Sequence, residues 1–165
     1  MQNDVTLIKV SIEEQCLQLI ESGCVTMDCR ISTASNGPGE LINSECTPRG
    51  WHRIRARIGA GCPENAVFVG RRPTGEIYTP ALRQQDPGRD WILTRILWLC
   101  GEEPGRNRLG EVDSMRRYIY IHGSPEEDPM GIPSSHGCIK MTNREVIKLF
   151  DRVSVGTRVL VEEVW

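Results

Sequence analysis

A thiol and two imidazoles lie close together in the sequence. His122 ends a short alternating apolar run, and His136 and Cys138 follow in a Ser-His-Gly-Cys segment. A cysteine nucleophile needs a base that takes its proton and N–H donors that stabilise the developing oxyanion. We expect Cys138 to be the nucleophile and His122 the general base, because an imidazole titrates near neutral pH. The backbone N–H groups around His136, Gly137 and Cys138 are expected to form the oxyanion hole.

The same residues also allow a metal site or a purely structural role. A catalytic imidazole needs a partner that orients it, and the carbonyl oxygen of Gly123 is a candidate. His122, His136 and Cys138 could instead supply three ligands to zinc, but a fourth ligand and the typical spacing are missing. A lone cysteine is commonly a small buried apolar side chain, so this interpretation stays open as well.

Length and composition indicate a single domain over residues 1–165. The chain is 39% hydrophobic and 25% charged, with a formal net charge of -2. This length is sufficient for a sizeable core. The small net charge provides no basic face, so we expect no nucleic-acid partner. The 16 glycines and 10 prolines indicate many turns, which favours a fold rich in strands.

The seven cysteines and the N-terminal sequence together predict a cytoplasmic protein. The cysteines form no CxxC pair, and their odd number leaves at least one unpaired within the chain. From Met1 onward there is no basic leader and no apolar run of signal-peptide length, and no segment is long enough to span a membrane. We therefore expect reduced thiols in the cytosol and no membrane partner.

Alternating apolar residues predict a chain built mainly of strands. Short runs near the N-terminus recur every 8–12 residues, which is typical of an antiparallel meander. Residues 91–99 are almost continuously apolar, and periodicity does not decide between a buried strand and a short buried helix. Residues 71–90 are expected to be irregular, and 101–114 to form a polar loop, for which a lid over the site is one interpretation. The expected strands cover residues 5–12, 15–20, 24–33, 51–58, 66–70, 116–122 and 157–164.

Two elements around the Ser-His-Gly-Cys segment are expected to position the chemistry. The strand over 116–122 would place Tyr118, Tyr120 and His122 on one face, because side chains alternate along a strand. After the cysteine, Thr142 and Glu145 fit the capping box of a helix. Apolar residues then recur at helical spacing, and Gly156 ends the pattern. These apolar residues are Val146, Leu149, Phe150 and Val153.

His122-Gly123, eleven further residues and Ser135-His-Gly-Cys138 form one pattern that leads into the capped helix. This pattern resembles the catalytic signature of the L,D-transpeptidase (YkuD) family. The resemblance extends over about residues 5–162, because earlier segments are also similar to elements of that family. These segments are Gln15, Ser32-Thr33 and the turn Thr47-Pro-Arg-Gly50.

The resemblance implies a mainly β (α+β) fold of packed mixed sheets with few helices. It implies that Cys138 attacks the carbonyl at the L-centre of a diamino acid, usually meso-diaminopimelate, in a peptidoglycan stem peptide. The terminal D-alanine would leave and an acyl-enzyme would form. His122 would be the base, oriented by the carbonyl of Gly123, while Ser135 and His136 would shape the site. No metal or cofactor is implied, and a carbapenem is expected to acylate Cys138.

One position departs from the family pattern. Lys140 stands where the family usually has an arginine two residues after the cysteine. Arginine can hold a carboxylate with two parallel hydrogen bonds, and lysine cannot. We expect Lys140 to keep a looser contact with substrate, and Ser135, Tyr120 and Arg117 to contribute to the same binding surface. A solvated surface charge is the alternative for Lys140 and the favoured interpretation of Arg117.

The motif leaves the acyl acceptor open. Water would give an L,D-carboxypeptidase, and an amine would give a transpeptidase. Because we expect the chain to stay inside the cell, away from cross-linked wall, we favour removal of D-alanine from stem tetrapeptides during muropeptide recycling. A cross-linking transpeptidase is the first alternative. A catalytically inactive stem-peptide-binding domain is the second, and the intact His122 and Cys138 argue against it. The sequence does not predict an oligomeric state.

Overall fold

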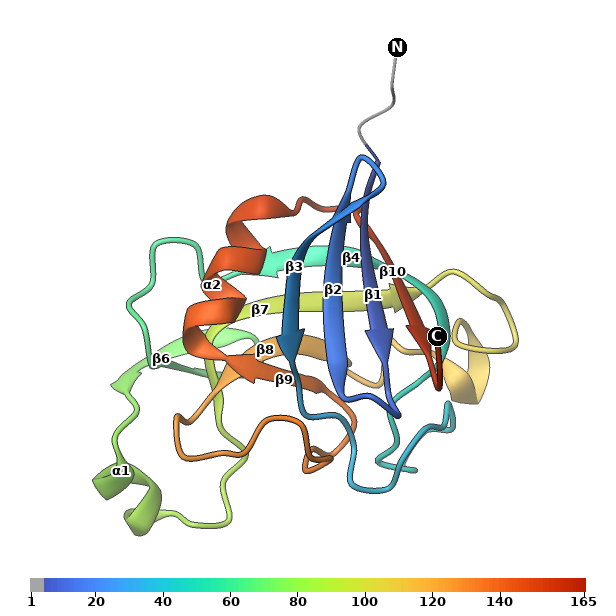
Figure 1. Cartoon of the computed structure of the whole chain (residues 1–165). Helices are drawn as coiled ribbons and strands as arrows, with labels where there is room; N and C mark the ends of the chain where they lie inside the picture. Colours follow the sequence, from blue (N-terminus) through green and yellow to red (C-terminus); the bar gives the residue numbers. More distant parts are fainter. Residues whose placement is uncertain (1–4) are drawn as a thin grey trace.

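In the computed structural model, which describes residues 5–165, the chain forms a curled mixed β-sheet with two α-helices beside it (Figure 1). The mainly β fold expected from the sequence is therefore confirmed. The strands are β1 (Thr6–Ser11), β2 (Cys16–Glu21), β3 (Cys24–Arg30), β4 (Gly50–Ile58), β5 (Ala66–Val69), β6 (Arg72–Ile77), β7 (Ile92–Gly101), β8 (Tyr120–Ser124), β9 (Ile139–Thr142) and β10 (Arg158–Glu162). The helices are α1 (Pro80–Gln85) and α2 (Asn143–Arg152), and a 3-10 turn, η1, covers Gly110–Val112.

The order of the strands brings distant parts of the chain together. The main path of the sheet runs β3-β2-β1-β10-β4-β7-β5-β6, and β8 joins it by pairing with β7 and β9. The first three strands form the predicted antiparallel meander, whereas β1 with β10 and β8 with β9 are parallel. In the β8–β9 pair, His122 lies opposite Lys140. The sheet thus places the histidine strand directly beside the strand that follows Cys138.

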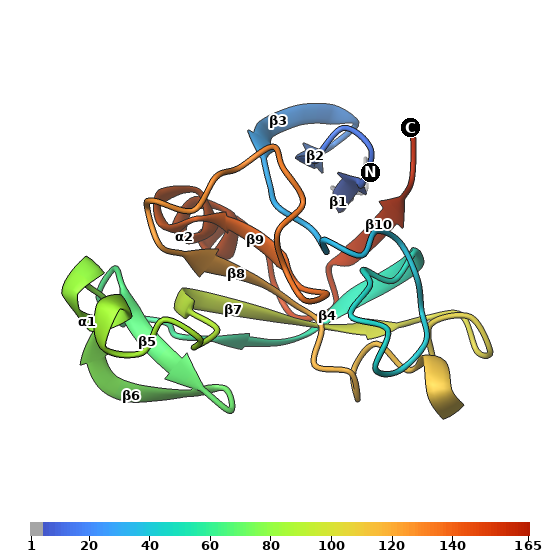
Figure 2. The ribbon, with the colours of Figure 1, turned by 90° about the horizontal axis from the view of Figure 1, so that it is seen from below.

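Helix α2 fastens this part of the sheet to the core. The hydroxyl of Thr142 accepts a hydrogen bond from the N–H of Glu145 at 3.2 Å, so the predicted cap is confirmed. The apolar stripe of the helix is buried, with Val146 and Leu149 fully inaccessible to solvent. Burying each such side chain contributes roughly 1.5–3 kcal/mol before entropy is counted. Figure 2 shows α2 beside β8 and β9, the strands that carry His122 and Lys140.

The prediction of a strand from residue 116 was wrong for its first half. Residues 116–118 belong to a turn, and β8 begins at Tyr120 and continues to Ser124, so His122 is an interior strand residue. The carboxylate of Asp113 accepts hydrogen bonds from the N–H groups of Leu109 and Arg116, which holds the chain in a turn. Tyr118 has φ +57° and is 53% exposed. It therefore lies outside the alternation expected for the strand.

Two further regions are more ordered than the sequence suggested. Residues 71–90 contain β6 and α1, where Thr79 caps the helix and Pro80 occupies its first turn. The strand β9 was not predicted, because its four residues merge with the helix cap. The ambiguous segment 91–99 is a strand, β7. The remaining predicted strands and the helix agree with the structure to within about three residues at each end.

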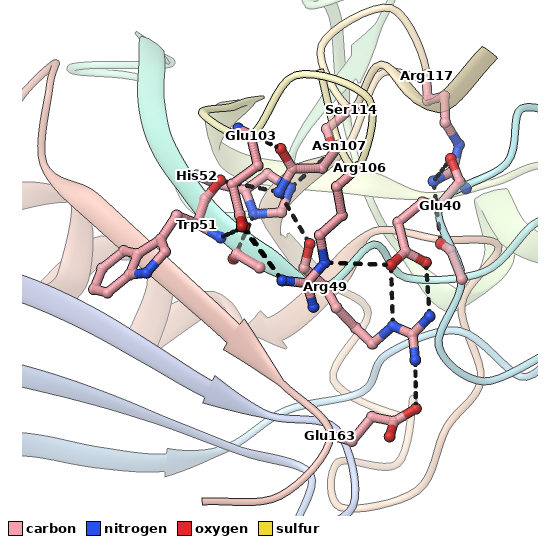
Figure 3. A network of polar contacts seen from close by, with 12 residues as sticks. Glu40, Arg49, Trp51, His52, Glu103, Arg106, Asn107, Ser114, Arg117 and Glu163 are labelled. Atoms are coloured by element: carbon pink, nitrogen blue, oxygen red, sulfur yellow. Dashed lines mark hydrogen bonds and ion pairs between the residues drawn. The ribbon is translucent and has the colours of Figure 1, made fainter. Parts of the chain in front are cut away.

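The polar segment 101–114 is tied to β4 (Figure 3). The carboxylate of Glu103 accepts the N–H of Trp51 at 2.7 Å, and the amide of Asn107 donates to the carbonyls of Arg49 and Trp51, both at 3.0 Å. A side chain at Gly50, whose φ is +95°, would collide with the Glu103 carboxylate. The glycine of the Thr-Pro-Arg-Gly turn is therefore needed for this close approach.

Acid is expected to destabilise the fold through His52, which lies in β4 and is fully buried. Its Nδ1 donates to the Gly50 carbonyl and its Nε2 accepts from the Ser114 hydroxyl at 2.8 Å. Burial lowers its pKa from 6.5 to about 4. Because the unfolded chain binds this proton more readily, stability present above pH 6.5 is lost as pH falls toward 4, by about 3 kcal/mol. Urea unfolding at several pH values checks this. His52→Gln should weaken the pH dependence, and an unchanged dependence would contradict the assignment.

Candidate active site

Cys138 and His122 line one cavity of about 510 Å³, together with Tyr120, Ser135 and Lys140. Strand β8 supplies His122 and Tyr120, and the turn that enters β9 supplies Ser135 and Cys138. The parallel pairing of β8 with β9 fixes these two segments relative to each other. The sheet therefore brings a thiol and an imidazole from separate segments to one hollow.

The thiol of Cys138 is protonated at neutral pH. Its sulfur accepts the N–H of Tyr120 at 3.3 Å, and its S–H donates to the Tyr118 carbonyl at 3.4 Å. Burial is the main reason that its pKa is raised to about 12. The Tyr120 N–H and Arg117 act in the opposite direction, while the carboxylate of Asp90 raises the pKa further. A base must therefore remove the proton before or during attack by this sulfur.

His122 is fully enclosed within β8 and has the tautomer that a base requires. Its Nδ1 lies 2.6 Å from the carbonyl oxygen of Gly123. Because a carbonyl can only accept, Nδ1 carries the proton and Nε2 is left with a free lone pair. Among residues 5–165, no group donates a hydrogen bond to Nε2. Burial lowers the pKa of His122 from its ordinary value of 6.5, so the ring is neutral at physiological pH.

The turn that carries Cys138 is held by side chains on both sides. The hydroxyl of Ser135 donates to the Cys138 carbonyl at 2.6 Å and accepts the Gly137 N–H at 3.2 Å. Thr47 donates its hydroxyl to the Gly137 carbonyl at 2.9 Å. Gly137 has φ +132°, and an added Cβ would lie 3.2 Å from the carbonyl of Cys46, so glycine is required here.

These contacts narrow the set of N–H groups that could stabilise an oxyanion. The N–H of Gly137 is already engaged by Ser135, so it is not a free donor. The N–H groups of His136 and Cys138 donate to no other group in the part of the chain that the structure describes. These two are therefore the donors that remain from the predicted set.

Two early segments support the same turn. The side-chain amide of Gln15 makes two hydrogen bonds with Thr33. Its Nε2 donates to the Thr33 hydroxyl at 2.6 Å, and its Oε1 accepts the Thr33 backbone N–H at 2.9 Å. The carbonyl of Thr33 then accepts the N–H groups of Ser134 and Ser135, each at 2.9 Å. Ser32 pairs with Lys140 through two backbone hydrogen bonds of 2.9 Å. These segments resembled a family pattern in the sequence, and the structure gives the physical reason for their residue types.

The two basic residues predicted to meet substrate are both engaged within the protein. The ammonium of Lys140 lies 2.7 Å from a carboxylate oxygen of Asp128, and both side chains are nearly buried. Arg117 donates to the carbonyls of Glu40 and Cys46 at 3.1 and 2.7 Å (Figure 3 shows its position above Glu40). Both line the cavity, but their charges are used to fix the walls rather than left free for a ligand.

Three further placements complete the site. His136 is exposed on the rim of the cavity, and Tyr120 is buried with its hydroxyl bonded to Arg71 at 2.9 Å. Arg71 and Asp90 also line the cavity, and no sequence signal pointed to them. Within residues 5–165, no group of three or more His, Cys, Asp or Glu side chains is arranged to hold a metal ion. The zinc interpretation thus receives no support from the described residues.

Comparison with known proteins identifies the family of this chain. Residues 5–161 match the family described as the L,D-transpeptidase catalytic domain, YkuD. The chain belongs to this family. A 47-residue segment is 49% identical to a putative L,D-transpeptidase, YqjB, of Bacillus subtilis, and it covers 28% of this chain and 27% of that protein. The YkuD family resemblance seen in the sequence is therefore confirmed.

Solved structures show the same fold at low sequence identity. An L,D-transpeptidase from Mycobacterium smegmatis aligns with a TM-score of 0.60 and 19% identity, over 95% of this chain and 58% of that one. The L,D-transpeptidase LdtMt1 in complex with imipenem aligns with a TM-score of 0.57 and 16% identity, over 97% and 60%. This YkuD domain thus spans less than two thirds of either solved relative. No helix within residues 5–165 is both long and apolar enough to cross a membrane.

Proposed function

We propose that this YkuD domain is a cysteine-dependent L,D-carboxypeptidase that removes the terminal D-alanine from peptidoglycan stem tetrapeptides. The observation that carries the proposal is a single cavity that holds the Cys138 thiol and the His122 imidazole in its basic tautomer. Membership of the family supports a peptidoglycan substrate. No metal or cofactor enters the proposed reaction.

The proposed reaction has two steps. His122 Nε2 takes the thiol proton as Cys138 Sγ attacks the carbonyl carbon of the residue before D-alanine, and the N–H groups of His136 and Cys138 stabilise the oxyanion. The C–N bond then breaks, the D-alanine nitrogen takes the proton from His122, and a thioester remains. Water, deprotonated by His122, attacks the thioester, which releases the shortened peptide and restores the thiol. Gly123 orients the base, and Ser135 holds the turn.

The resting protonation states explain why substrate must be bound first. Burial raises the pKa of the Cys138 thiol and lowers that of the His122 imidazole, and both shifts disfavour a thiolate–imidazolium pair in the free site. Transfer of the proton becomes favourable when the sulfur starts to bond to carbon, because the negative charge then moves to the oxyanion.

Access of water to the acyl-enzyme supports hydrolysis as the second step. Cys138 is half-buried rather than sealed. The residues that line the cavity include none from the segment 101–114, which is fastened to β4 instead. A lid from that segment therefore has no support in this arrangement, and the thioester on Cys138 would face solvent.

The proposal includes a cytoplasmic site of action, where soluble muropeptides are recycled. All seven cysteines are free thiols in the structure. Thiols persist in this number in reducing compartments, and in oxidising ones they tend to pair. Fractionation of cells that produce the protein, with immunodetection, checks the location.

One observation favours transpeptidation as a second candidate function. A hollow of about 320 Å³ shares Arg117, Tyr118 and His136 with the cavity, and Ile42 and Asn43 are among its other lining residues. A second stem peptide could enter there and bring an amine to the thioester. The same cavity would also suit an inactive domain that binds stem peptides without cleaving them.

A single assay separates these functions. The purified protein is incubated with a disaccharide-tetrapeptide, alone and with a D-amino acid or a second stem peptide, and the products are analysed by mass spectrometry. Loss of one alanine in both conditions is expected. Exchange or dimer products would favour the transpeptidase instead. Absence of any product from correctly folded protein would favour the binding domain.

A further inference from the structure

The pairing of β7 with β8 is interrupted directly beside the general base. His122 and Gly123 are neighbours in β8, but two extra residues separate their pairing partners in β7. These extra residues, Thr94 and Arg95, form a bulge opposite the peptide that orients the base. A bulge bends its strand locally, and bulges are frequent next to active sites because they redirect nearby groups. The contacts that fix this bulge therefore bear on the direction of the Gly123 carbonyl.

Thr94 has a backbone conformation that threonine rarely adopts. Its φ is +74°, and a β-branched side chain is unfavourable in this left-handed region. The residue is fully buried, so water does not stabilise its polar groups. Such a conformation persists only where the surrounding structure holds it, and it is found most often at functional sites. The contacts of Thr94 must therefore stabilise the bulge against this strain.

Three hydrogen bonds among Thr94, Asn65 and Asn143, here called the Thr94 network, hold the bulge. The hydroxyl of Thr94 accepts the N–H of Asn65 at 3.0 Å and donates to Oδ1 of Asn143 at 2.7 Å. The side-chain nitrogen of Asn143 donates to Oδ1 of Asn65 at 2.8 Å. On the other side, the guanidinium of Arg95 donates to the carbonyls of Thr94 and Cys62 at 2.6 and 2.8 Å. Because Asn143 is the buried first residue of α2, the network ties β7 to this helix.

Gly123 lies against the Thr94 network. A Cβ added to Gly123 would collide with Oδ1 of Asn143 and would lie 3.2 Å from Cβ of Thr94. The missing side chain thus lets the network reach the backbone of β8 at the residue whose carbonyl oxygen binds Nδ1 of His122. No member of the network lines the catalytic cavity. An effect of the network on the reaction therefore passes through the backbone of Gly123.

We propose that Thr94 and Asn143 are positioning residues for the general base. Their hydrogen bond holds the bulge against Gly123, which keeps the Gly123 carbonyl directed at Nδ1 of His122. The proton then stays on Nδ1, and Nε2 keeps the lone pair that takes the thiol proton. The catalytic consequence rests on the proposed function, whereas the tautomer of His122 is a property of the protein that is measured without substrate.

The first test measures the tautomer of His122 by NMR of protein labelled in its histidine ring nitrogens. The parent should carry the proton on Nδ1, and comparison with His122→Gln assigns the signals. Thr94→Val keeps the branched shape but removes the hydroxyl, so it is expected to give a mixture of both neutral tautomers. Thr94→Ser retains the hydroxyl and should have the parent tautomer. Asn143→Ala removes the other partner and should give the same mixture, which keeps the test decisive if Thr94→Val does not fold.

Turnover provides the second test. Thr94→Val and Asn143→Ala should each lower kcat for alanine release by about tenfold or more and leave KM within about twofold, because neither side chain lines the cavity. The double variant should be about as active as the less active single variant, since both changes remove the same hydrogen bond.

Thr157→Val is the matched control for loss of a buried threonine hydroxyl. Thr157 is also buried and its hydroxyl accepts the N–H of Ser154 at 3.1 Å, but it does not line the cavity and is not part of the Thr94 network. This variant should unfold at a lower temperature than the parent and keep both the tautomer of His122 and kcat.

Two results would overturn the proposal. If Thr94→Val and Asn143→Ala kept the parent tautomer, their hydrogen bond would not orient the base, whatever happened to turnover. If Thr157→Val lowered kcat as much as Thr94→Val does, the loss would reflect general destabilisation instead of positioning. Failure of the carboxypeptidase function is seen separately, because the wild-type protein would then release no alanine while the tautomer measurements would still decide the role of the Thr94 network.

Discussion

Cys138→Ala is expected to abolish release of alanine from the tetrapeptide, with a loss of at least about a thousandfold in kcat. The reason is that the proposed reaction forms a bond to Sγ, and no other thiol lines the cavity within residues 5–165. The fold should survive, because removal of one half-buried thiol costs about 1–2 kcal/mol. Mass spectrometry of the products and thermal unfolding of the variant measure the two effects.

Reaction with a carbapenem provides a second readout for the same substitution. The wild-type protein is expected to gain the mass of one carbapenem, as a thioester to Cys138, and Cys138→Ala should gain none. The solved relative in complex with imipenem supports this choice of probe. Cys46→Ala is a matched control, because the Cys46 carbonyl lies close to Gly137 but Cys46 does not line the cavity. Acylation or turnover that persisted in Cys138→Ala would show that the nucleophile is a different residue.

The candidate nucleophile and base could be proposed from the sequence because they belong to one short continuous pattern. The structure places both ends of this pattern, His122 and Cys138, at one cavity. The amphipathic stripe of α2 and its cap at Thr142 were likewise readable, since both depend on spacing within one element. For this helix, the features that depend on neighbours in sequence agree with the structure.

Features that depend on contacts between distant segments could not be predicted in this way. Arg71 follows β5 and Asp90 precedes β7, and these two strands pair, so the sheet carries both residues to the cavity. The ion pair between Lys140 and Asp128 is of the same kind, because a loop folds back onto β9. Tyr118 lies in a turn and not in the predicted strand for a local reason. The Asp113 carboxylate holds this turn, and strand propensity does not take that contact into account. The sequence alone therefore could not predict which charged side chains of the site are paired within the protein and which are not.

His122→Gln is expected to lower kcat/KM by about a hundredfold to ten-thousandfold, the usual contribution of a general base. Glutamine can still donate to the Gly123 carbonyl, but it offers no lone pair of comparable basicity. Unfolding at pH 7 should change little, because the amide replaces the bond of 2.6 Å that fixes the ring. His136→Gln is the matched control: its side chain is exposed on the rim, and only its backbone N–H is assigned a role.

The pH profile distinguishes a base from a residue that merely shapes the site. Burial holds the pKa of His122 below 6.5, so the wild-type rate should stay constant down to that pH and decline only in more acidic solution, where the ring gains a proton. The residual activity of His122→Gln should lack this acid limb, whereas His136→Gln should retain it. If His136→Gln lost the acid limb and His122→Gln kept it, the base would be His136. The Gly123 carbonyl would then have no role in orienting the base. We expect His136→Gln to keep the fall of the rate at low pH and His122→Gln to lose it. This combination of results would show that the proton passes through the imidazole of His122 in β8.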